Sequence, residues 1–515
     1  MRKPFLKLKF LFLALPALLG ARTLSVEGTS GSPAIEFQGI RIDHFDLPGL
    51  ELELCKELVP YLDLPWTEET LFCLKKTIAA FFKREGKPLV FVDTSICEDD
   101  HLHVQIQEGR LGQIRVSHNR WVSASSICRQ IRLCSDEPLD SELLLQDLRW
   151  LCRSPFQEID AIFTPGEKPY TADIELLARD RFPLRGFTSV DNTGVVSTGR
   201  TRYVAGLQAA PFFNHLLTYQ FSTGNSYPDF HSHFLQYTWP FSWRNWLDLY
   251  GAYECTQSGR STLGSARYTI PTAMHAPWSV WEFTLGFDFK QTQEDLCQRQ
   301  TVNLTQFLAS LQVGAIECPH EFLLTANLYG SPGNLTGKRG SKSHFETFRT
   351  DASNRYLYLN TAFYYAYTLP AHFLWTLNLR GQLSSTNLLP SEQFGLGGFS
   401  SVRGYNEFQA VTDNALLINT ELRSPLLPLL DRFHLRDYDE GLQLLFFLDS
   451  GLGCNHKKER ALKSFHSLTG IGPGLRYSID PYFSLRLDWG LNLNQLFGDK
   501  SFKSRLHFAV FLNLW

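Results

Sequence analysis

The feature that most constrains the fold is a long series of short segments after residue 184 in which apolar and polar residues alternate. Alternation with a period of two puts apolar side chains on one face of a β-strand and polar side chains on the other. Many segments are roughly ten residues long, which suits a tilted strand that crosses a bilayer. We predict sixteen strands, at 184–191, 201–210, 215–223, 231–241, 245–256, 262–270, 279–290, 301–313, 321–330, 356–368, 372–385, 414–424, 441–450, 467–478, 483–492 and 504–515.

The last segment shows the two faces of such a strand. One face is unbroken apolar, with Leu506, Phe508, Val510, Leu512 and Leu514; the other is mixed, with His507, Ala509, Phe511, Asn513 and Trp515. This contrast is expected where the first face meets lipid and the second a wet lumen. A soluble all-β sandwich is the alternative that the alternation alone leaves open.

Aromatic residues mark a boundary near residue 185. Residues 1–185 hold 17 of the 70 aromatic residues, and residues 186–515 hold the other 53. After the amino terminus, no uncharged apolar run approaches the roughly 18 residues that a membrane helix requires. We therefore predict a transmembrane β-barrel over 184–515.

The amino terminus reads as a secretory signal peptide over residues 1–21. Basic residues from Arg2 to Lys9 precede a short apolar core, Phe10–Leu19, and Ala21 is a plausible cleavage point. No cysteine follows that core, so a lipoprotein anchor is not expected.

Between the signal and the barrel, one order of elements occurs twice. We predict two β-α-α-β-β modules, over 22–110 and 111–183, that repeat in pattern rather than in identity. The first has a strand at 35–45, helices at 51–61 and 67–83, and strands at 89–93 and 101–107. The second has a strand at 111–117, helices at 125–134 and 141–152, and strands at 156–163 and 171–178.

Charge and cysteine content exclude several classes of function. A net charge of −3 gives no nucleic-acid footprint. The ten cysteines fit no zinc spacing, and for an exported chain both disulfides and buried free thiols remain open. We see no P-loop, G-x-S-x-G or H-E-x-x-H motif, and we expect no catalytic residue, no cofactor, no metal and no enzymatic activity.

A glycine-rich stretch, Phe394–Tyr405, reads as a loop with a single charge, Arg403. About forty-five residues later, Asp449 is the only charge in the apolar segment Leu442–Gly453. A lone carboxylate in such a segment should be paired or lie on a wet face. Either the two residues form a pair, or Arg403 is a solvated loop arginine and Asp449 the cap of a strand end.

Five stretches, taken together and in order, resemble the haemolysin-activator (TpsB-type) transporters of two-partner secretion, ShlB/FhaC/HecB-like, within the POTRA-plus-barrel superfamily of outer-membrane assembly proteins. The resemblance covers nearly the whole mature chain. The stretches are Ser391–Phe394 with Gly397, Gly398 and Val402-Arg403-Gly404-Tyr405; Phe447-Leu448-Asp449-Ser450-Gly451; Gly470-x-Gly472-x-Gly474-Leu475-Arg476-Tyr477; Asp191-Asn192-Thr193-Gly194 with Thr198-Gly199; and the terminal Trp515.

The resemblance implies a mainly β protein in the bacterial outer membrane, with two α+β POTRA domains in the periplasm followed by a sixteen-stranded antiparallel barrel. Its implied function is to recognise an unfolded, TpsA-like exoprotein through the POTRA domains and to secrete it through the barrel. An outer-membrane protein assembly or insertion factor is the alternative. Implied partners are the client, outer-membrane lipid and the barrel assembly machinery, and no nucleic acid.

Within this family, Arg403 would lie on the large inward-folded loop and pair with Asp449 as a latch. A guanidinium binds a carboxylate through two parallel hydrogen bonds, and a buried pair is costly to break on one side. Only Arg22–Ala34 precede the first predicted strand, which is too short for the plug helix and linker of many members. For the client, we predict docking at an exposed edge of the second module, His118–Ser125 with the facing strand Thr171–Ala178.

Overall fold

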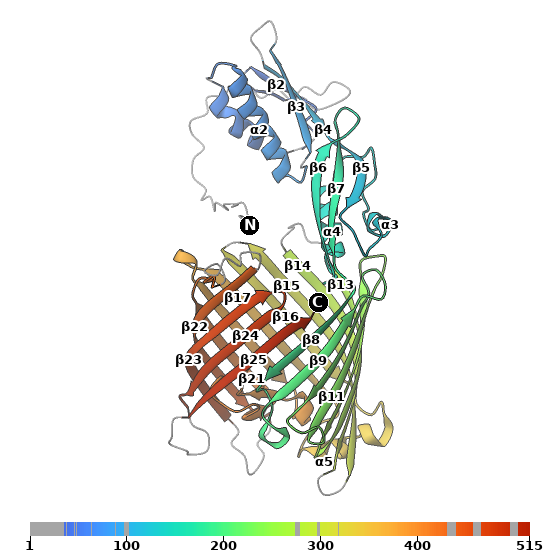
Figure 1. Cartoon of the computed structure of the whole chain (residues 1–515), viewed down its shortest axis with the longest axis vertical. Helices are drawn as coiled ribbons and strands as arrows, with labels where there is room; N and C mark the ends of the chain where they lie inside the picture. Colours follow the sequence, from blue (N-terminus) through green and yellow to red (C-terminus); the bar gives the residue numbers. More distant parts are fainter. Residues whose placement is uncertain are drawn as a thin grey trace. The chain divides into compact units, whose positions relative to one another are not determined.

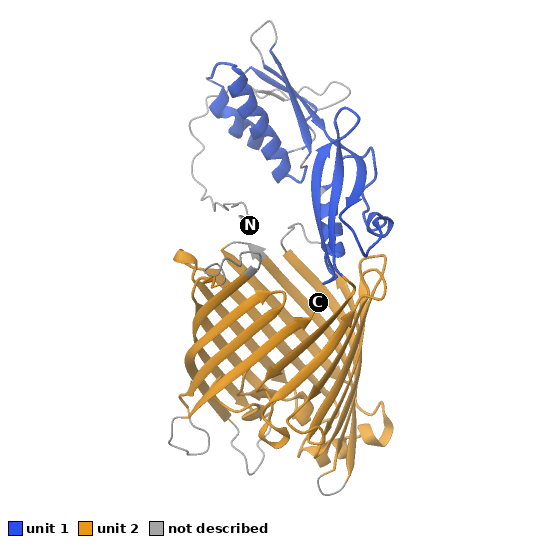
Figure 2. Cartoon of the chain, in the orientation of Figure 1, with its two compact units in different colours: residues 1–181 blue, residues 182–515 orange. Residues whose placement is uncertain are grey.

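The computed structural model describes residues 35–37, 39–45, 47, 49–62, 64–87, 89–96, 102–272, 279–295, 299–317, 319–429, 439–456, 465–494 and 503–514. The chain forms two compact units, Met1–Arg181 and Phe182–Trp515 (Figure 2). The predicted signal peptide, the segment Arg22–Ala34 and Trp515 lie outside the described residues.

The first module of unit 1 packs two helices on one sheet. Its elements are β1 (Ile35–Phe37), β2 (Ile40–Asp43), α1 (Glu51–Leu58), η1 (Val59–Tyr61), α2 (Glu68–Arg84), β3 (Val90–Ile96) and β4 (Leu102–Glu108), with sheet order β1-β2-β4-β3. The single strand predicted at 35–45 is wrong: β1 and β2 pair antiparallel, because Gly39, with φ 86°, reverses the chain between them.

The second module repeats this topology. It contains β5 (Arg110–Ser117), α3 (Ala124–Cys128), α4 (Ser141–Leu151), β6 (Gln157–Pro165) and β7 (Thr171–Asp180). β5 pairs parallel with β7, and β6 pairs antiparallel with it, as β2, β3 and β4 do in the first module. The repeat predicted from pattern is therefore a repeat of sheet topology.

Two predictions for the second module are wrong. The helix predicted at 125–134 ends at Cys128, because the chain beyond it turns to bond the outer edge of β5: Asp136 N–H donates to the Leu111 carbonyl at 2.7 Å. The predicted docking edge Thr171–Ala178 is the centre of its sheet, since the order is β5-β7-β6 and most of its side chains are buried. A strand paired on both sides offers no edge to a client.

Unit 2 is a closed antiparallel barrel of sixteen strands, so the predicted fold class is confirmed (Figure 1). The strands are β8 (Leu184–Asp191), β9 (Arg202–Ala209), β10 (Leu216–Thr223), β11 (Phe230–Pro240), β12 (Trp246–Thr256), β13 (Gly259–Pro271), β14 (Ser279–Glu294), β15 (Gln300–Glu317), β16 (His320–Ser331), β17 (Tyr356–Thr368), β18 (Leu374–Ser384), β21 (Asn414–Arg423), β22 (Asp439–Cys454), β23 (Phe465–Asp480), β24 (Phe483–Asn492) and β25 (Ser504–Leu514). β25 pairs with β8 and closes the barrel, which removes the open sheet edges.

The two faces of β25 differ in exposure at several positions. Leu506 and Leu514 are more than half exposed, at 54% and 61%, whereas His507 is fully buried. No helix in the described ranges is both long and apolar enough to span a membrane.

Two long loops leave the same end of the barrel. Strands alternate in direction, so the loops after β16 (332–355) and after β18 (385–413) lie at the end opposite to the start of β8, which we call the outer end. The first carries η3 (Gly337–Gly340) and α5 (Lys342–Phe348). The second, which we call the luminal loop, carries η5 (Pro390–Glu392), β19 (Phe394–Leu396) and β20 (Ala410–Thr412).

Candidate functional site

The luminal loop reverses direction at its tip through glycines with positive φ. β19 and β20 pair antiparallel, and Gly397 and Gly398 follow with φ of 96° and 109°. The Gly398 N–H donates to the Val402 carbonyl at 3.0 Å, which closes a tight turn before Arg403. L-residues with a side chain rarely adopt these angles, which accounts for the paired glycines at this point.

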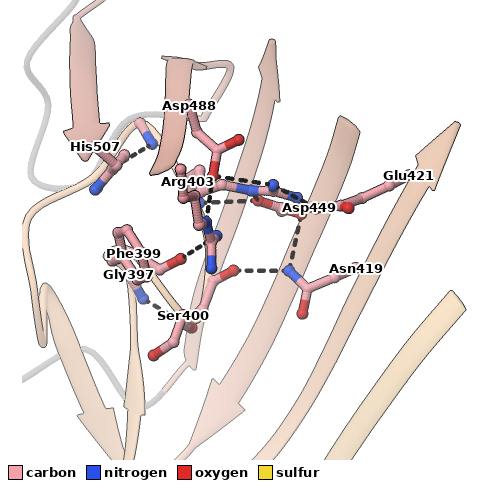
Figure 3. Close-up of polar contacts among 12 residues, drawn as sticks. Gly397, Phe399, Ser400, Arg403, Asn419, Glu421, Asp449, Asp488 and His507 are labelled. Carbon is pink, nitrogen blue, oxygen red and sulfur yellow. Dashed lines mark hydrogen bonds and ion pairs between the residues drawn. The ribbon is translucent and has the colours of Figure 1, made fainter. Parts of the chain in front are cut away.

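Arg403 and Asp449 form a buried, two-pronged ion pair (Figure 3). Arg403 Nε lies 2.7 Å from Asp449 Oδ2, and Nη2 lies 2.8 Å from Oδ1. The backbone N–H of Arg403 adds a third bond to Oδ2 at 3.0 Å. Arg403 is 2% exposed and Asp449 is not exposed at all, so neither residue is solvated. Parallel N–H donors on one carboxylate are the strong form of this contact.

Two further carboxylates face the same guanidinium. Arg403 Nη1 lies 2.6 Å from Glu421 Oε1 on β21 and 3.5 Å from Asp488 Oδ2 on β24. Both acids have arginine partners of their own: Asp488 is bonded by Arg476 at 2.7 Å and by Arg486 at 2.7 Å. The latch therefore belongs to a network that spans strands β21 to β24, which the sequence reasoning missed.

Phe447 and Gly451 shape the wall around the arginine. The guanidinium carbon of Arg403 lies 3.6 Å from the centre of the Phe447 ring, a cation–π distance. A Cβ on Gly451 would come within 2.9 Å of Val402 Cγ2 and 3.0 Å of Leu396 Cδ2. Phe447, on β22, is fully buried. The arginine therefore packs on the Phe447 ring, and the absence of a side chain at Gly451 leaves space for Val402.

Gly404 passes over the barrel wall at backbone contact distance. Its φ is 95°, and its N–H donates to His507 Nε2 at 3.1 Å. A Cβ on Gly490 of β24 would lie 2.7 Å from the Arg403 carbonyl carbon, and one on Gly470 of β23 would overlap the Arg403 carbonyl oxygen. The glycines of these strands thus make room for the loop backbone, a reason that the glycine pattern alone did not reveal.

Tyr405 ends the motif with a buried ring and a bonded hydroxyl. Its O–H donates to the Asn494 carbonyl at 2.5 Å and lies 3.1 Å from the Thr469 carbonyl. The backbone N–H groups of the same two residues donate back to the hydroxyl, at 3.2 Å and 3.3 Å. The tyrosine therefore fastens the loop to the outer ends of β23 and β24.

The stretch Asp191–Gly194 lies at the closing seam of the barrel. Beyond the last paired position of β8 and β25, Asn192 Nδ2 donates to the Leu506 carbonyl at 2.7 Å, and its Oδ1 accepts the Phe508 N–H at 3.0 Å. Asp191 Oδ1 accepts the Thr193 N–H at 2.9 Å and holds this turn. The asparagine side chain thus continues the strand ladder past the end of β8.

The described residues contain no cluster of three or more His, Cys, Asp or Glu side chains that could hold a metal ion. The seven described cysteines are free thiols; Cys97, Cys297 and Cys318 lie outside the described residues. The charged groups of the luminal site bind one another. The site can therefore hold the luminal loop in place against the barrel wall.

A sixteen-stranded closed barrel with a loop held inside it, preceded by two β-α-α-β-β modules, defines the POTRA-plus-barrel class of outer-membrane proteins. Solved structures share this fold. CdiB from Escherichia coli superposes with a TM-score of 0.71 at 18% identity, covering 96% of this chain and 93% of that one. CdiB from Acinetobacter baumannii gives 0.65 at 16% identity, covering 94% and 91%.

Sequence comparison defines the family more narrowly. Residues 313–477 match the family described as haemolysin secretion/activation protein ShlB/FhaC/HecB. The heme/hemopexin transporter protein HuxB of Haemophilus influenzae is 25% identical over 410 residues, which are 74% of this chain and 69% of that protein. The chain is therefore similar to these TpsB-type transporters, and it is an outer-membrane protein of two-partner secretion with periplasmic POTRA domains. The family works with a secreted exoprotein.

Proposed function

We propose that this transporter exports an unfolded exoprotein through its barrel while the luminal loop is held against the wall by Arg403. The observation that carries the proposal is the burial of Arg403 among three carboxylates, Asp449, Glu421 and Asp488. A buried arginine of this kind fixes a loop in one place, because leaving either charge unpaired is costly. Val402, Gly404 and Tyr405 complete the fixation through packing and backbone bonds.

We propose 22–110 and 111–183 as the two POTRA domains and 184–515 as the transport barrel. The client docks on the POTRA domains as an added strand, so main-chain hydrogen bonds supply affinity without requiring one sequence. No step of such transport forms or breaks a covalent bond, so we propose no enzymatic activity. The outward apolar side chains of the barrel contact lipid, and the barrel assembly machinery inserts the protein during biogenesis.

The edge offered to the client in the second domain is β6. Within the described part of the chain, β6 pairs with β7 alone. The Cys152 thiol bonds both the N–H and the carbonyl of Ile159, at 3.2 Å and 3.4 Å, and so occupies the first part of this edge. The rest carries Ile162 and Phe163, which are 45% and 43% exposed. An extended, apolar client segment can pair with such an edge strand as an additional strand of the sheet and pack against its exposed apolar side chains.

Photo-crosslinkers test this docking edge. With a stalled client, a crosslinker at Ile162 should capture the client, whereas one at Arg115 on the opposite edge strand, β5, serves as the matched exposed control. Capture at Arg115 and not at Ile162 would assign docking to β5 instead.

Comparison of secreted proteins with and without this transporter tests the function itself. Loss of one large exoprotein from the medium, with outer-membrane proteins unchanged, is the expected result. Loss of outer-membrane barrels instead would favour the assembly-factor alternative. The crystal structure of BamA from Haemophilus ducreyi lacking POTRA domains 1–3 shares the fold at a TM-score of 0.53 and 15% identity, so the fold alone does not decide between secretion and assembly.

A further inference from the structure

A second buried carboxylate, Asp413, joins three loops at the outer end of the barrel. It lies between β20 and β21 and is not exposed. It accepts hydrogen bonds from Arg349 in loop 332–355, from the Leu388 N–H at 3.0 Å in the luminal loop, and from the His456 N–H at 3.1 Å in the loop that follows β22. Segments far apart in the sequence therefore meet at one side chain.

The contact with Arg349 is a two-pronged ion pair. Nη1 lies 2.5 Å from Asp413 Oδ1, and Nη2 lies 2.9 Å from Oδ2. Arg349 directly follows α5, is 9% exposed, and also donates to the Leu388 carbonyl at 2.7 Å. The arginine thus binds both the carboxylate and the backbone at the start of the luminal loop.

An apolar cluster supports this pair. Its members come from α5 and the turn after it, from the start of the luminal loop, and from the outer ends of β15 and β17: Phe345, Ala352, Leu388, Leu389, Val302, Leu304, Tyr356 and Tyr358. Each of them is at most 6% exposed. The cluster seats α5 and the luminal loop against the same part of the wall, so the two loops form one packed layer rather than two separate ones.

A further ion pair fixes this layer to the wall. Glu392, 5% exposed, accepts from Lys290 Nζ of β14 at 2.6 Å and from the Tyr358 hydroxyl of β17 at 2.9 Å. These contacts lie on strands β14 and β17, whereas Arg403 is held on β21 to β24. The luminal loop is therefore fastened at two separate places.

We propose that Asp413 is the hub of an outer gate: its carboxylate ties loop 332–355, the start of the luminal loop and His456 into a cap, and the cap opens at the Arg349–Asp413 pair when the client leaves. The proposal rests on the proposed export function. The cap moves as a unit, because separating Arg349 from Asp413 breaks a buried, two-pronged ion pair between the loops.

Single-channel conductance of the purified full chain in planar bilayers, without client, tests the gate. Asp413→Asn keeps the shape of the side chain and removes its charge. We expect the open fraction to rise about tenfold or more, because the buried ion pair between Arg349 and Asp413 is lost. Arg349→Lys keeps the positive charge but loses the two parallel N–H donors of the guanidinium. It should therefore raise the open fraction by a smaller amount. Glu346→Gln on α5 is the matched control: its pair with Lys342 is exposed, and its conductance should equal that of the parent.

Heat-modifiable gel mobility shows which variants keep a folded barrel. If Asp413→Asn is folded and conducts like the parent, Asp413 is not the hub of a gate. If Asp413→Asn does not fold, Arg349→Lys replaces it in the test: a raised open fraction in the folded variant supports the gate, and conductance equal to that of the parent overturns it. An equal rise in Glu346→Gln would also overturn the proposal, because any change in the loop would then open the channel. The conductance measurement needs no client. Its result can therefore be interpreted even if the secretion test contradicts the proposed export function.

Discussion

Removing the Arg403 side chain should destabilise the barrel mainly through the carboxylate that it leaves behind. In Arg403→Ala, the unexposed Asp449 keeps two donors among the residues that the structure describes, the backbone N–H of residue 403 and the Asn419 amide at 2.8 Å. The other two acids are better provided for, since Glu421 keeps Arg423 and Asp488 keeps two arginines. The cost therefore falls on Asp449.

Breaking one side of a buried ion pair costs about 3–5 kcal/mol. The two remaining donors bring the expected loss in the free energy of unfolding for Arg403→Ala to the lower end, about 3 kcal/mol. Arg403→Lys should lose less free energy of unfolding, because an ammonium group keeps the charge but binds fewer carboxylate oxygens than a guanidinium group does. The exchange Arg403→Asp with Asp449→Arg should fail to restore stability, because the new aspartate faces Glu421 and Asp488.

Urea unfolding of the detergent-solubilised protein, followed by heat-modifiable mobility, measures these changes. Arg299→Ala is the matched control: its pair with Asp295 is 71% exposed on the arginine side, so its removal should change the free energy of unfolding little. If Arg403→Ala costs no more than Arg299→Ala, the luminal pair is effectively solvated and the reasoning about its burial is wrong.

Three further changes test other parts of the structure. Gly490→Ala should weaken or displace the luminal loop, because its Cβ would lie 2.7 Å from the Arg403 carbonyl carbon; protease cleavage of the loop in the intact barrel, compared with Gly264→Ala at an open position, measures this. Asn192→Ala should lower the free energy of unfolding by about 1–3 kcal/mol through loss of two seam hydrogen bonds, and an unchanged free energy of unfolding would contradict the role of the amide. In the first POTRA domain, burial raises the pKa of Asp43, but the hydrogen bonds and charges of His103 and Arg41 together outweigh it, and the pKa lies below its usual 3.8. The stabilisation from Asp43 is therefore present above pH 4 and lost as the pH falls through the lowered pKa; urea unfolding of residues 35–181 should show this acid loss, and His103→Gln should reduce it.

The barrel could be predicted from sequence because each strand carries its own signal. The bounds of β8 and β17 agree with the predicted segments to the residue. Turn-forming residues flank both strands: Pro183 and Asn192 beside β8, and Asn354 and Pro370 near the ends of β17. The predicted number of sixteen strands is also confirmed. In a closed barrel every strand pairs on both sides, so none of these segments can be left out.

The wrong predictions share a cause in pairing, which a single segment does not encode. The run at 35–45 alternates throughout, yet Gly39 turns it back on itself. Thr171–Ala178 alternates like an edge strand, but parallel pairing with β5 places it in the centre. Glu421 and Asp488 are each the only acid in their strands, β21 and β24. They escaped notice because only the barrel register brings both of them to Arg403.

A double-mutant cycle on Arg403 and Asp449, read out as secreted client and as free energy of unfolding, tests the central claim most directly. The account predicts that Arg403→Ala and Asp449→Ala each reduce export, and that the double variant is no worse than the worse single one, with a coupling energy of about 2 kcal/mol or more. Losses that simply add, in a barrel that is folded and inserted, would show that the two residues act separately and that the luminal loop is not held by their contact.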